Sequence, residues 1–245
     1  MIKHLKETQE IAEGWTPQEV LAWSFRTFGP TIEMASGFGP EGMALIDIAA
    51  RLNPSLRVFT IDTGFLFPET YQLIGEVESR YGVEVERVQP RLTPSDQAEV
   101  YGEALWSTNP DQCCSLRKVE PLKEKLSSLR AWITAIRRDQ TKVRANARKV
   151  EWDQKFQLVK INPIADWTND DVWDYIRENN VPYNPLHDAN YTSIGCTHCT
   201  RAVRPGEDPR AGRWAGFQKP ECGLHLPDAP AANVLLVQIG LSGGS

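Results

Sequence analysis

The sequence has no long hydrophobic run and no excess of positive charge. No stretch approaches the roughly 18 apolar residues that a membrane-spanning helix needs. Its 27 basic side chains are outnumbered by 32 acidic ones, and the net charge of −5 gives no overall attraction for nucleic acid or an anionic membrane. The first residues, MIKHLKETQEIAEG, lack the apolar core and cleavage site of a secretory leader. We therefore expect a cytoplasmic protein with reduced thiols, and neither a membrane nor a nucleic acid as partner.

Two widespread nucleotide-binding motifs are also missing. The chain contains neither the Gly-Lys-Ser/Thr of a Walker A loop nor a G-x-G-x-x-G fingerprint. Internal repeats and low-complexity tracts are absent as well, which excludes a repeat architecture. If the protein binds a nucleotide, it must do so with a different loop.

What is present is an alternation of strand-like and helix-like segments. Short buried-strand patterns alternate with helical spacing from residue 31 to residue 90, and this βαβαβ order predicts an α/β fold. We expect a Rossmann-like parallel sheet with helices on both faces, followed after about residue 180 by an irregular segment. The expected strands lie within 31–36, 57–64, 83–90, 131–140 and 156–164, and the expected helices within 16–29, 43–53, 67–82 and 168–180.

Two loops follow the first two expected strands, where doubly wound sheets bind their ligands. The first, ASGFGPEG, supplies Ser36, Gly37 and Gly39, which allow the backbone to approach a phosphate at the start of the next helix. The second contains Asp62 and Thr63, and Asp62 is placed either to hold a ribose hydroxyl or to cap the following helix. Each loop by itself is also compatible with a simple tight turn. Together they favour a nucleotide pocket.

Cysteine is scarce, and four of the five cysteines form two close pairs. Cys113 and Cys114 are adjacent, and Cys196 and Cys199 form a Cys-x-x-Cys turn of the kind used for zinc and for iron–sulfur ligation. A redox dithiol would leave the first pair unexplained. Adjacent cysteines fit a single tetrahedral zinc ion poorly, whereas a cubane spreads its ligands over separate iron corners. We therefore favour a [4Fe–4S] cluster bound by all four.

Basic residues gather on either side of the second cysteine pair. Arg137 and Arg138 lie in AIRRDQTKVRANARK, and Arg210 and Arg213 lie in TRAVRPGEDPRAGRW. Guanidinium groups bind phosphate and sulfate in bidentate fashion, so these segments indicate an anion site, although some arginines have acidic neighbours to pair with. Lys118, four residues after Cys114, is placed to offset the negative charge of a cluster.

The fifth cysteine, Cys222, stands alone in KPECGLHLP. His225 lies three residues further on, and basic neighbours or a histidine lower the pKa of a thiol and make it nucleophilic. Gly223 leaves the backbone free to move. The alternative is that Cys222 is an inert cysteine. We favour the hypothesis that it is a mobile, nucleophilic thiol.

Four segments together resemble a known family. CCSLRKVEPL, WITAIRRDQ, GCTHCTRAVRPGEDPRAGRW and ECGLH look like the signature segments of the assimilatory adenylylsulfate (APS) reductases, which group with the phosphoadenylylsulfate (PAPS) reductases. The resemblance runs from about Ser36 to His225. It implies an adenine-nucleotide α-hydrolase-like fold and reduction of APS to sulfite and AMP, in sulfate assimilation and cysteine biosynthesis. It also implies an S-sulfocysteine intermediate and thioredoxin, or a glutaredoxin-like protein, as the reductant in trans.

The resemblance assigns roles to residues of this chain. Cys222 would be the nucleophile with His225 near it, and Lys118 would link the electrostatics of cluster and substrate. The phosphosulfate would be held by Arg210 and Arg213, with Arg137 or Arg138. The four paired cysteines, Cys113, Cys114, Cys196 and Cys199, would bind the [4Fe–4S] cluster. The nucleotide would contact Ser36, Gly37, Phe38, Gly39, Asp62 and Thr63. The first loop departs from the Ser-Phe-Gly or Ser-Leu-Gly common in the family, which affects its individual contacts.

These patterns predict one domain over residues 1–225, with a mobile catalytic segment at 200–227 and a tail at 228–245. A homo-oligomer is possible, since relatives often form tetramers. The nearest alternative is a PAPS reductase, which shares the Cys222 motif but typically lacks the two cysteine pairs. A tRNA-thiolating ATP-pyrophosphatase would need the Asp-Ser that SGFGPEG lacks. A non-enzymatic zinc-stapled interaction module would explain the four paired cysteines but not Cys222 or the arginines.

Overall fold

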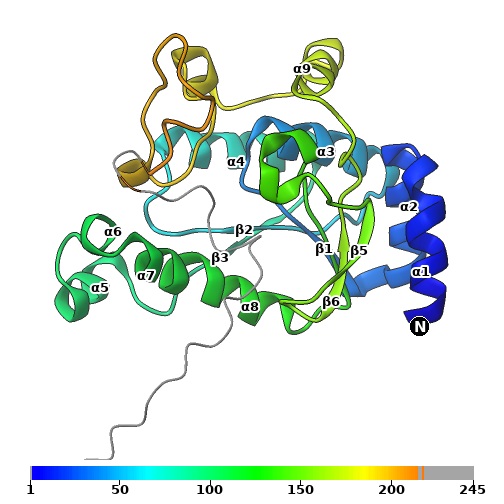
Figure 1. Cartoon of the computed structure of the whole chain (residues 1–245), viewed down its shortest axis with the longest axis horizontal. Helices are drawn as coiled ribbons and strands as arrows, with labels where there is room; N and C mark the ends of the chain where they lie inside the picture. Colours follow the sequence, from blue (N-terminus) through cyan, green and yellow to red (C-terminus); the bar gives the residue numbers. More distant parts are fainter. Residues whose placement is uncertain (1, 215–216, 218–245) are drawn as a thin grey trace, which may run out of the picture.

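Six strands form one sheet at the centre of the computed structural model, which describes residues 2–214 and residue 217 (Figure 1). The strand order is β3-β2-β1-β4-β6-β5, and all neighbouring pairs are parallel except β5 and β6. The expected α/β fold with a mostly parallel sheet is confirmed. The strands are β1 (Ile32–Ala35), β2 (Val58–Ile61), β3 (Val85–Val88), β4 (Ala131–Ile133), β5 (Val150–Asp153) and β6 (Leu158–Ile161).

Each of the five expected strand segments contains a strand, shorter than its segment because the chain leaves the sheet early to form the loops. The antiparallel edge strand β5 is an addition that the sequence pattern does not predict. It pairs with β6 as a hairpin in which Val150 lies opposite Ile161 and Asp153 opposite Leu158. A four-residue strand held only by this pairing carries too few apolar positions to register as a strand in the sequence.

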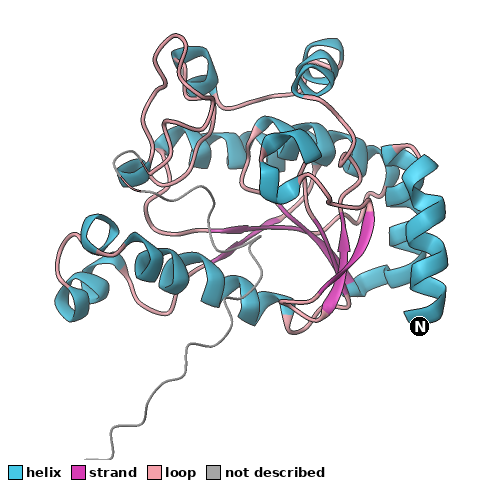
Figure 2. Ribbon diagram, in the orientation of Figure 1, coloured by secondary structure: helices cyan, strands magenta, loops and turns pink. Residues whose placement is uncertain are grey.

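Helices cover both faces of the sheet (Figure 2). The four expected helices correspond to α2, α3, α4 and α9. The sequence pattern predicts no helix or strand between Thr93 and Leu126. In the structure this segment forms α5 to α8, with a π-helical turn at Ser115–Val119. None of the described helices is long and apolar enough to span a membrane. The helices are α1 (Ile2–Ile11), α2 (Pro17–Phe28), α3 (Pro40–Leu52), α4 (Pro68–Tyr81), α5 (Pro94–Tyr101), α6 (Leu105–Thr108), α7 (Pro110–Cys114), α8 (Glu120–Leu126) and α9 (Asn169–Glu178).

Alternating strand residues supply two hydrophobic cores, one on each side of the sheet. Ala131 and Ile133 of β4 belong to the larger core under α2, α3 and α4, whereas Trp132 between them points to the smaller one. The smaller core packs Trp132 and Phe59 against Leu122 and Leu126 of α8. Both faces of β4 are therefore buried, as expected for a central strand between helical layers.

Helix α9 begins with a reciprocal capping box. The Asp171 backbone N–H donates to Thr168 Oγ1 at 3.1 Å, and the Thr168 N–H donates to Asp171 Oδ2 at 2.7 Å. We expect Thr168→Ala to lower the free energy of unfolding by about 1 kcal/mol, because one helix N–H loses its acceptor. Urea denaturation followed by circular dichroism would measure this loss. Thr168→Ser is the matched control, since it retains the hydroxyl; an equal loss in both variants would contradict the capping role.

Candidate functional site

The carboxyl ends of β1 and β4 border a cavity of about 650 Å³. The chain order reverses between these two strands, since β2 and β3 extend the sheet on one side and β4 and β6 on the other. Open α/β sheets bind ligands in the crevice at such a switch point. Ser36 and Gly37 line the cavity after β1, and Thr134 and Arg137 line it after β4. Its volume lies within the roughly 300–1,000 Å³ typical of small-molecule sites.

The first predicted loop contributes three of its four expected residues to the cavity. Ser36, Gly37 and Gly39 line it, whereas the Phe38 side chain is only 1% exposed and packs in the core. The Phe38 backbone has φ 57°, a left-handed conformation uncommon outside glycine, and its N–H donates to Ser36 Oγ at 3.1 Å. The buried Phe38 side chain thus anchors the loop to the hydrophobic core. A Cβ on Gly42 would lie 2.7 Å from Ser36 Oγ, so this glycine allows the helix to begin directly against the loop.

The two predicted residues of the second loop, Asp62 and Thr63, lie in different environments. Thr63 lines the cavity, and its Oγ1 lies 3.3 Å from Cys196 Sγ. The Asp62 carboxylate accepts hydrogen bonds from the Tyr71 hydroxyl at 2.7 Å and the Gly64 N–H at 2.9 Å, and it does not line the cavity. Burial and this carboxylate raise the pKa of Tyr71 to about 12, so the hydroxyl remains a donor. In the structure Asp62 therefore shapes the turn between β2 and α4.

Four of the predicted cationic residues line the cavity: Lys118, Arg137, Arg210 and Arg213. Arg213 is held by its surroundings, because its Nη1 donates to the Ile194 carbonyl at 3.1 Å and its guanidinium lies 4.5 Å from the Trp214 ring centre. A Cβ at Gly195 would lie 2.5 Å from Arg213 Nη2. Only glycine at position 195 leaves room for this guanidinium beside the backbone.

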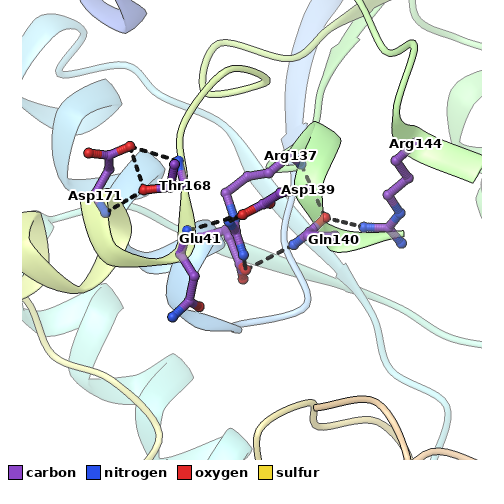
Figure 3. Close-up of polar contacts among 8 residues, drawn as sticks. Glu41, Arg137, Asp139, Gln140, Arg144, Thr168 and Asp171 are labelled. Atoms are coloured by element: carbon purple, nitrogen blue, oxygen red, sulfur yellow. Dashed lines mark hydrogen bonds and ion pairs between the residues drawn. The ribbon is translucent and has the colours of Figure 1, made fainter. Parts of the chain in front are cut away.

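The adjacent arginines Arg137 and Arg138 point in different directions. Arg137 is 4% exposed and forms ion pairs with Glu41 at 3.1 Å and with Asp139 (Figure 3). Arg138 instead pairs with Glu13 and donates from Nε to the Ala147 carbonyl at 2.8 Å, away from the cavity. Of the two, the structure places only Arg137 at the cavity. Its charge is balanced by two carboxylates, which fix its position.

The two predicted cysteine pairs come together although more than 80 residues separate them. Cys113 and Cys114 end α7. Cys196 directly precedes the 3₁₀ turn η7 (Thr197–Cys199), and Cys199 is the last residue of that turn. All four thiols are free and line one narrow pocket. Phe65, Trp106 and His198 cover this pocket, with the Trp106 and His198 rings stacked at 4.7 Å. In the described ranges, no three His, Cys, Asp or Glu side chains are arranged to hold a single metal ion.

The thiols of the two pairs have different electrostatic environments. Burial, reinforced by the neighbouring thiols, raises the pKa of Cys113 to about 11 and also raises that of Cys199. Burial opposes the thiolate at Cys196 too, but Lys118, a hydrogen bond with Thr63 and Arg213 outweigh it and lower the pKa. Such thiols repel one another as thiolates unless a cation is bound among them. The four thiols are donors of the type that metal centres use, although the described side chains are not arranged around a single ion.

Lys118 lines both the large cavity and the four-thiol pocket. It lies in the π-helical turn Ser115–Val119, a distortion that occurs frequently at functional sites. Its ammonium group acts electrostatically on Cys196 and Cys199 and forms a hydrogen bond with Cys196. The two sites are therefore adjacent and share a positive charge.

The predicted nucleophile Cys222 and its neighbour His225 lie outside the described residues, as do the end of the segment 200–227 and the tail 228–245.

Several cavity residues were not predicted from the sequence. Thr134 directly follows β4 and Glu41 lies in the ASGFGPEG loop after β1, so a position after a strand was an available signal for both. His187 also lines the cavity and lies in the 3₁₀ turn η6 (Pro185–Ala189). No sequence signal identified it, because it lies in the irregular part of the chain.

Fold and site together define a Rossmann-like α/β protein with a ligand cavity at its switch point and a four-thiol pocket beside it. The model of the phosphoadenosine phosphosulfate reductase domain matches residues 31–202, and the chain belongs to this family. It is 50% identical over 208 residues to adenosine 5′-phosphosulfate reductase 2 of Bacillus subtilis (strain 168), covering 84% of this chain and 88% of that protein.

Two further relatives carry the name of the PAPS enzyme. The phosphoadenosine 5′-phosphosulfate reductase of Gloeobacter violaceus is 44% identical over 223 residues, which cover 89% of this chain and 92% of that protein. The crystal structure of phosphoadenylyl-sulfate (PAPS) reductase from Candida auris, a phosphate complex, is similar with a TM-score of 0.70 at 30% identity, covering 82% of this chain and 97% of that chain.

Proposed function

We propose that this protein reduces APS to sulfite and AMP, as part of sulfate assimilation and cysteine biosynthesis. The observation that carries the proposal is the position of Lys118 between the cavity and the four-thiol pocket, with Arg210 and Arg213 lining the same cavity. The names of the relatives at 44–50% identity support APS as substrate. PAPS is the alternative, since the relative from Gloeobacter violaceus is named for it.

In this proposal the nucleotide occupies the 650 Å³ cavity. Ser36, Gly37 and Gly39 lie at the start of α3, where free backbone N–H groups and the helix dipole favour an anion. Lys118, Arg210 and Arg213 provide the positive charge for the phosphosulfate. Arg137 faces the same cavity, whereas Arg138 and Asp62 support the surrounding loops.

The chemistry is a thiol substitution at sulfur. The Cys222 thiolate attacks the sulfur of APS, the bond from sulfur to the bridging oxygen breaks, and AMP leaves with the electron pair, which gives an S-sulfocysteine. A thiolate of thioredoxin, or of a glutaredoxin-like protein, then attacks the Cys222 sulfur and sulfite leaves. The second thiol of the partner closes its disulfide and restores Cys222, so the dithiol supplies both electrons. Lys118 and the arginines stabilise the charge on the leaving phosphate, and His225 lies near the thiol.

We assign the four paired cysteines to a [4Fe–4S] cluster. The free state of these thiols, their common pocket and the cationic Lys118 beside them support this assignment. When bound, the cluster would supply fixed charge and a rigid connection between the two cysteine segments, without exchanging electrons with substrate. The proposal further includes a single domain over 1–225 with a mobile segment at 200–227, a cytoplasmic location and a possible homo-oligomer.

The decisive test is the intact mass of the protein after anaerobic incubation with APS and no reductant. We expect a gain of one SO₃ group, localised to Cys222 by peptide mapping and released by thioredoxin. An adduct with PAPS but not with APS would retain the chemistry and reverse the substrate. No adduct with either compound would contradict the proposed reaction. Zinc without iron in the purified protein would instead favour the zinc-stapled interaction module.

A further inference from the structure

The loop from Thr200 to Arg213 (orange in Figure 1) carries two of the arginines that line the cavity, Arg210 and Arg213. Its two ends are paired, because Thr200 and Arg213 form an antiparallel bridge and the Arg201 N–H donates to the Gly212 carbonyl at 3.0 Å. A Cβ on Gly212 would lie 2.2 Å from the Arg201 carbonyl oxygen, so only glycine allows the two ends to approach this closely. The loop is therefore closed at its base, and both cavity arginines lie in its second half.

Glu207 fastens the middle of this loop to its base. Its carboxylate accepts two hydrogen bonds from the Arg201 guanidinium, at 2.7 Å and 3.1 Å, and a third from the Arg204 N–H at 2.9 Å. These donors lower the pKa of Glu207 to about 2, so the carboxylate is ionised near neutral pH. Most exposed ion pairs contribute little, but a bidentate guanidinium–carboxylate pair also fixes geometry. Glu207 is therefore placed to define the shape of the loop.

Four residues lie between Glu207 and Gly212, and both of these residues are fastened to Arg201. Arg210 is one of the four, and its N–H donates to Asp208 Oδ1 at 2.7 Å in a tight turn. Neither Arg201 nor Glu207 lines the cavity. The ion pair thus supports the turn that carries Arg210 and does not itself reach a ligand in the cavity.

Arg213 is held independently of this pair, because its guanidinium donates to the chain at 193–194. Arg210 is therefore the cavity cation of this loop whose position depends on the turn. We propose that Glu207 is a positioning residue: paired with Arg201, it holds the turn that presents the Arg210 guanidinium to the anionic group of the bound nucleotide. This inference rests on the proposed function.

The test is calorimetric binding of APS to the metal-loaded Cys222→Ser protein, with and without Glu207→Gln, which keeps the size of the side chain and removes its charge. By charge alone, losing a carboxylate near an anion site would tighten APS binding, so a weaker affinity reports the lost position of Arg210. We expect binding about tenfold weaker, close to the loss of one charge-assisted hydrogen bond. The Thr192 hydroxyl still donates to the Pro209 carbonyl, so the turn is loosened and not released.

A double-mutant cycle tests whether the effect passes through Arg210. In the Arg210→Ala background, Glu207→Gln should add less than about a twofold loss, because the guanidinium that it positions is gone. A further tenfold loss there would overturn the positioning role. Asp174→Asn is the matched control, since it removes the same charge from an exposed ion pair with Arg177 on α9 and should not weaken APS binding.

The remaining outcomes separate this inference from the proposed function. Equal or tighter APS binding by Glu207→Gln would overturn the role of Glu207 and leave the proposed function intact. Failure of the Cys222→Ser parent to bind APS would contradict the proposed function, and this inference with it. If Glu207→Gln does not fold, Arg201→Lys replaces it, because lysine keeps the charge and loses the bidentate geometry. Weaker APS binding is then again expected, and unchanged binding would again contradict the role.

Discussion

Replacing Cys222 by serine is expected to abolish sulfite formation while leaving the iron content unchanged. A serine hydroxyl is almost wholly protonated near pH 7 and cannot form the S-sulfocysteine, so we expect turnover to fall by at least about 1,000-fold. Sulfite release from APS with thioredoxin measures the loss, and visible absorbance with iron analysis measures the cluster. AMP binding by calorimetry is the control for an intact cavity and should match wild type.

Two outcomes would contradict this expectation in different ways. Turnover within tenfold of wild type would show that Cys222 is not the nucleophile. Loss of iron together with activity would show that Cys222 is a ligand, and the four paired cysteines would then not be the complete ligand set. Because Cys222 lies outside the described residues, this chemical test is the means of assigning it.

The second large effect is expected at the four-thiol pocket. Cys196→Ala should remove most of the bound iron and the visible absorbance, because Cys196 borders the pocket together with Cys113, Cys114 and Cys199. Structural metal sites contribute directly to folding, so the variant should also unfold at lower urea concentration. Iron and sulfide analysis, absorbance and urea denaturation measure these changes.

The matched control for Cys196→Ala is Cys222→Ser, which also removes one thiol but should retain full iron. An unchanged spectrum in Cys196→Ala would contradict the assignment of this residue as a ligand. Stoichiometric zinc in wild type, with zinc lost from the variant, would contradict the iron–sulfur cluster and retain the site. The two variants therefore separate the roles of nucleophile and ligand.

The sequence by itself was sufficient for the fold class, for four helices and five strand segments, and for the grouping of four cysteines. These features depend on local patterns: apolar periodicity of 2 or 3.6 residues, helix caps such as Thr168, and close cysteine spacing. Such patterns are too weak to identify elements of only four to eight residues. The antiparallel β5 and the helices of the Thr93–Leu126 segment were not predicted for this reason.

The tertiary structure alone decided which of the predicted residues meet. Some neighbours in sequence lie in different environments. Arg137 lines the cavity, whereas Arg138 pairs with Glu13. The Phe38 side chain is buried in the core, whereas Gly37 and Gly39 on either side of it line the cavity. Distant residues met: the π-helical turn places Lys118 between the cavity and the thiols. The direction of a side chain depends on packing and on long-range hydrogen bonds, and neither is encoded in a local pattern.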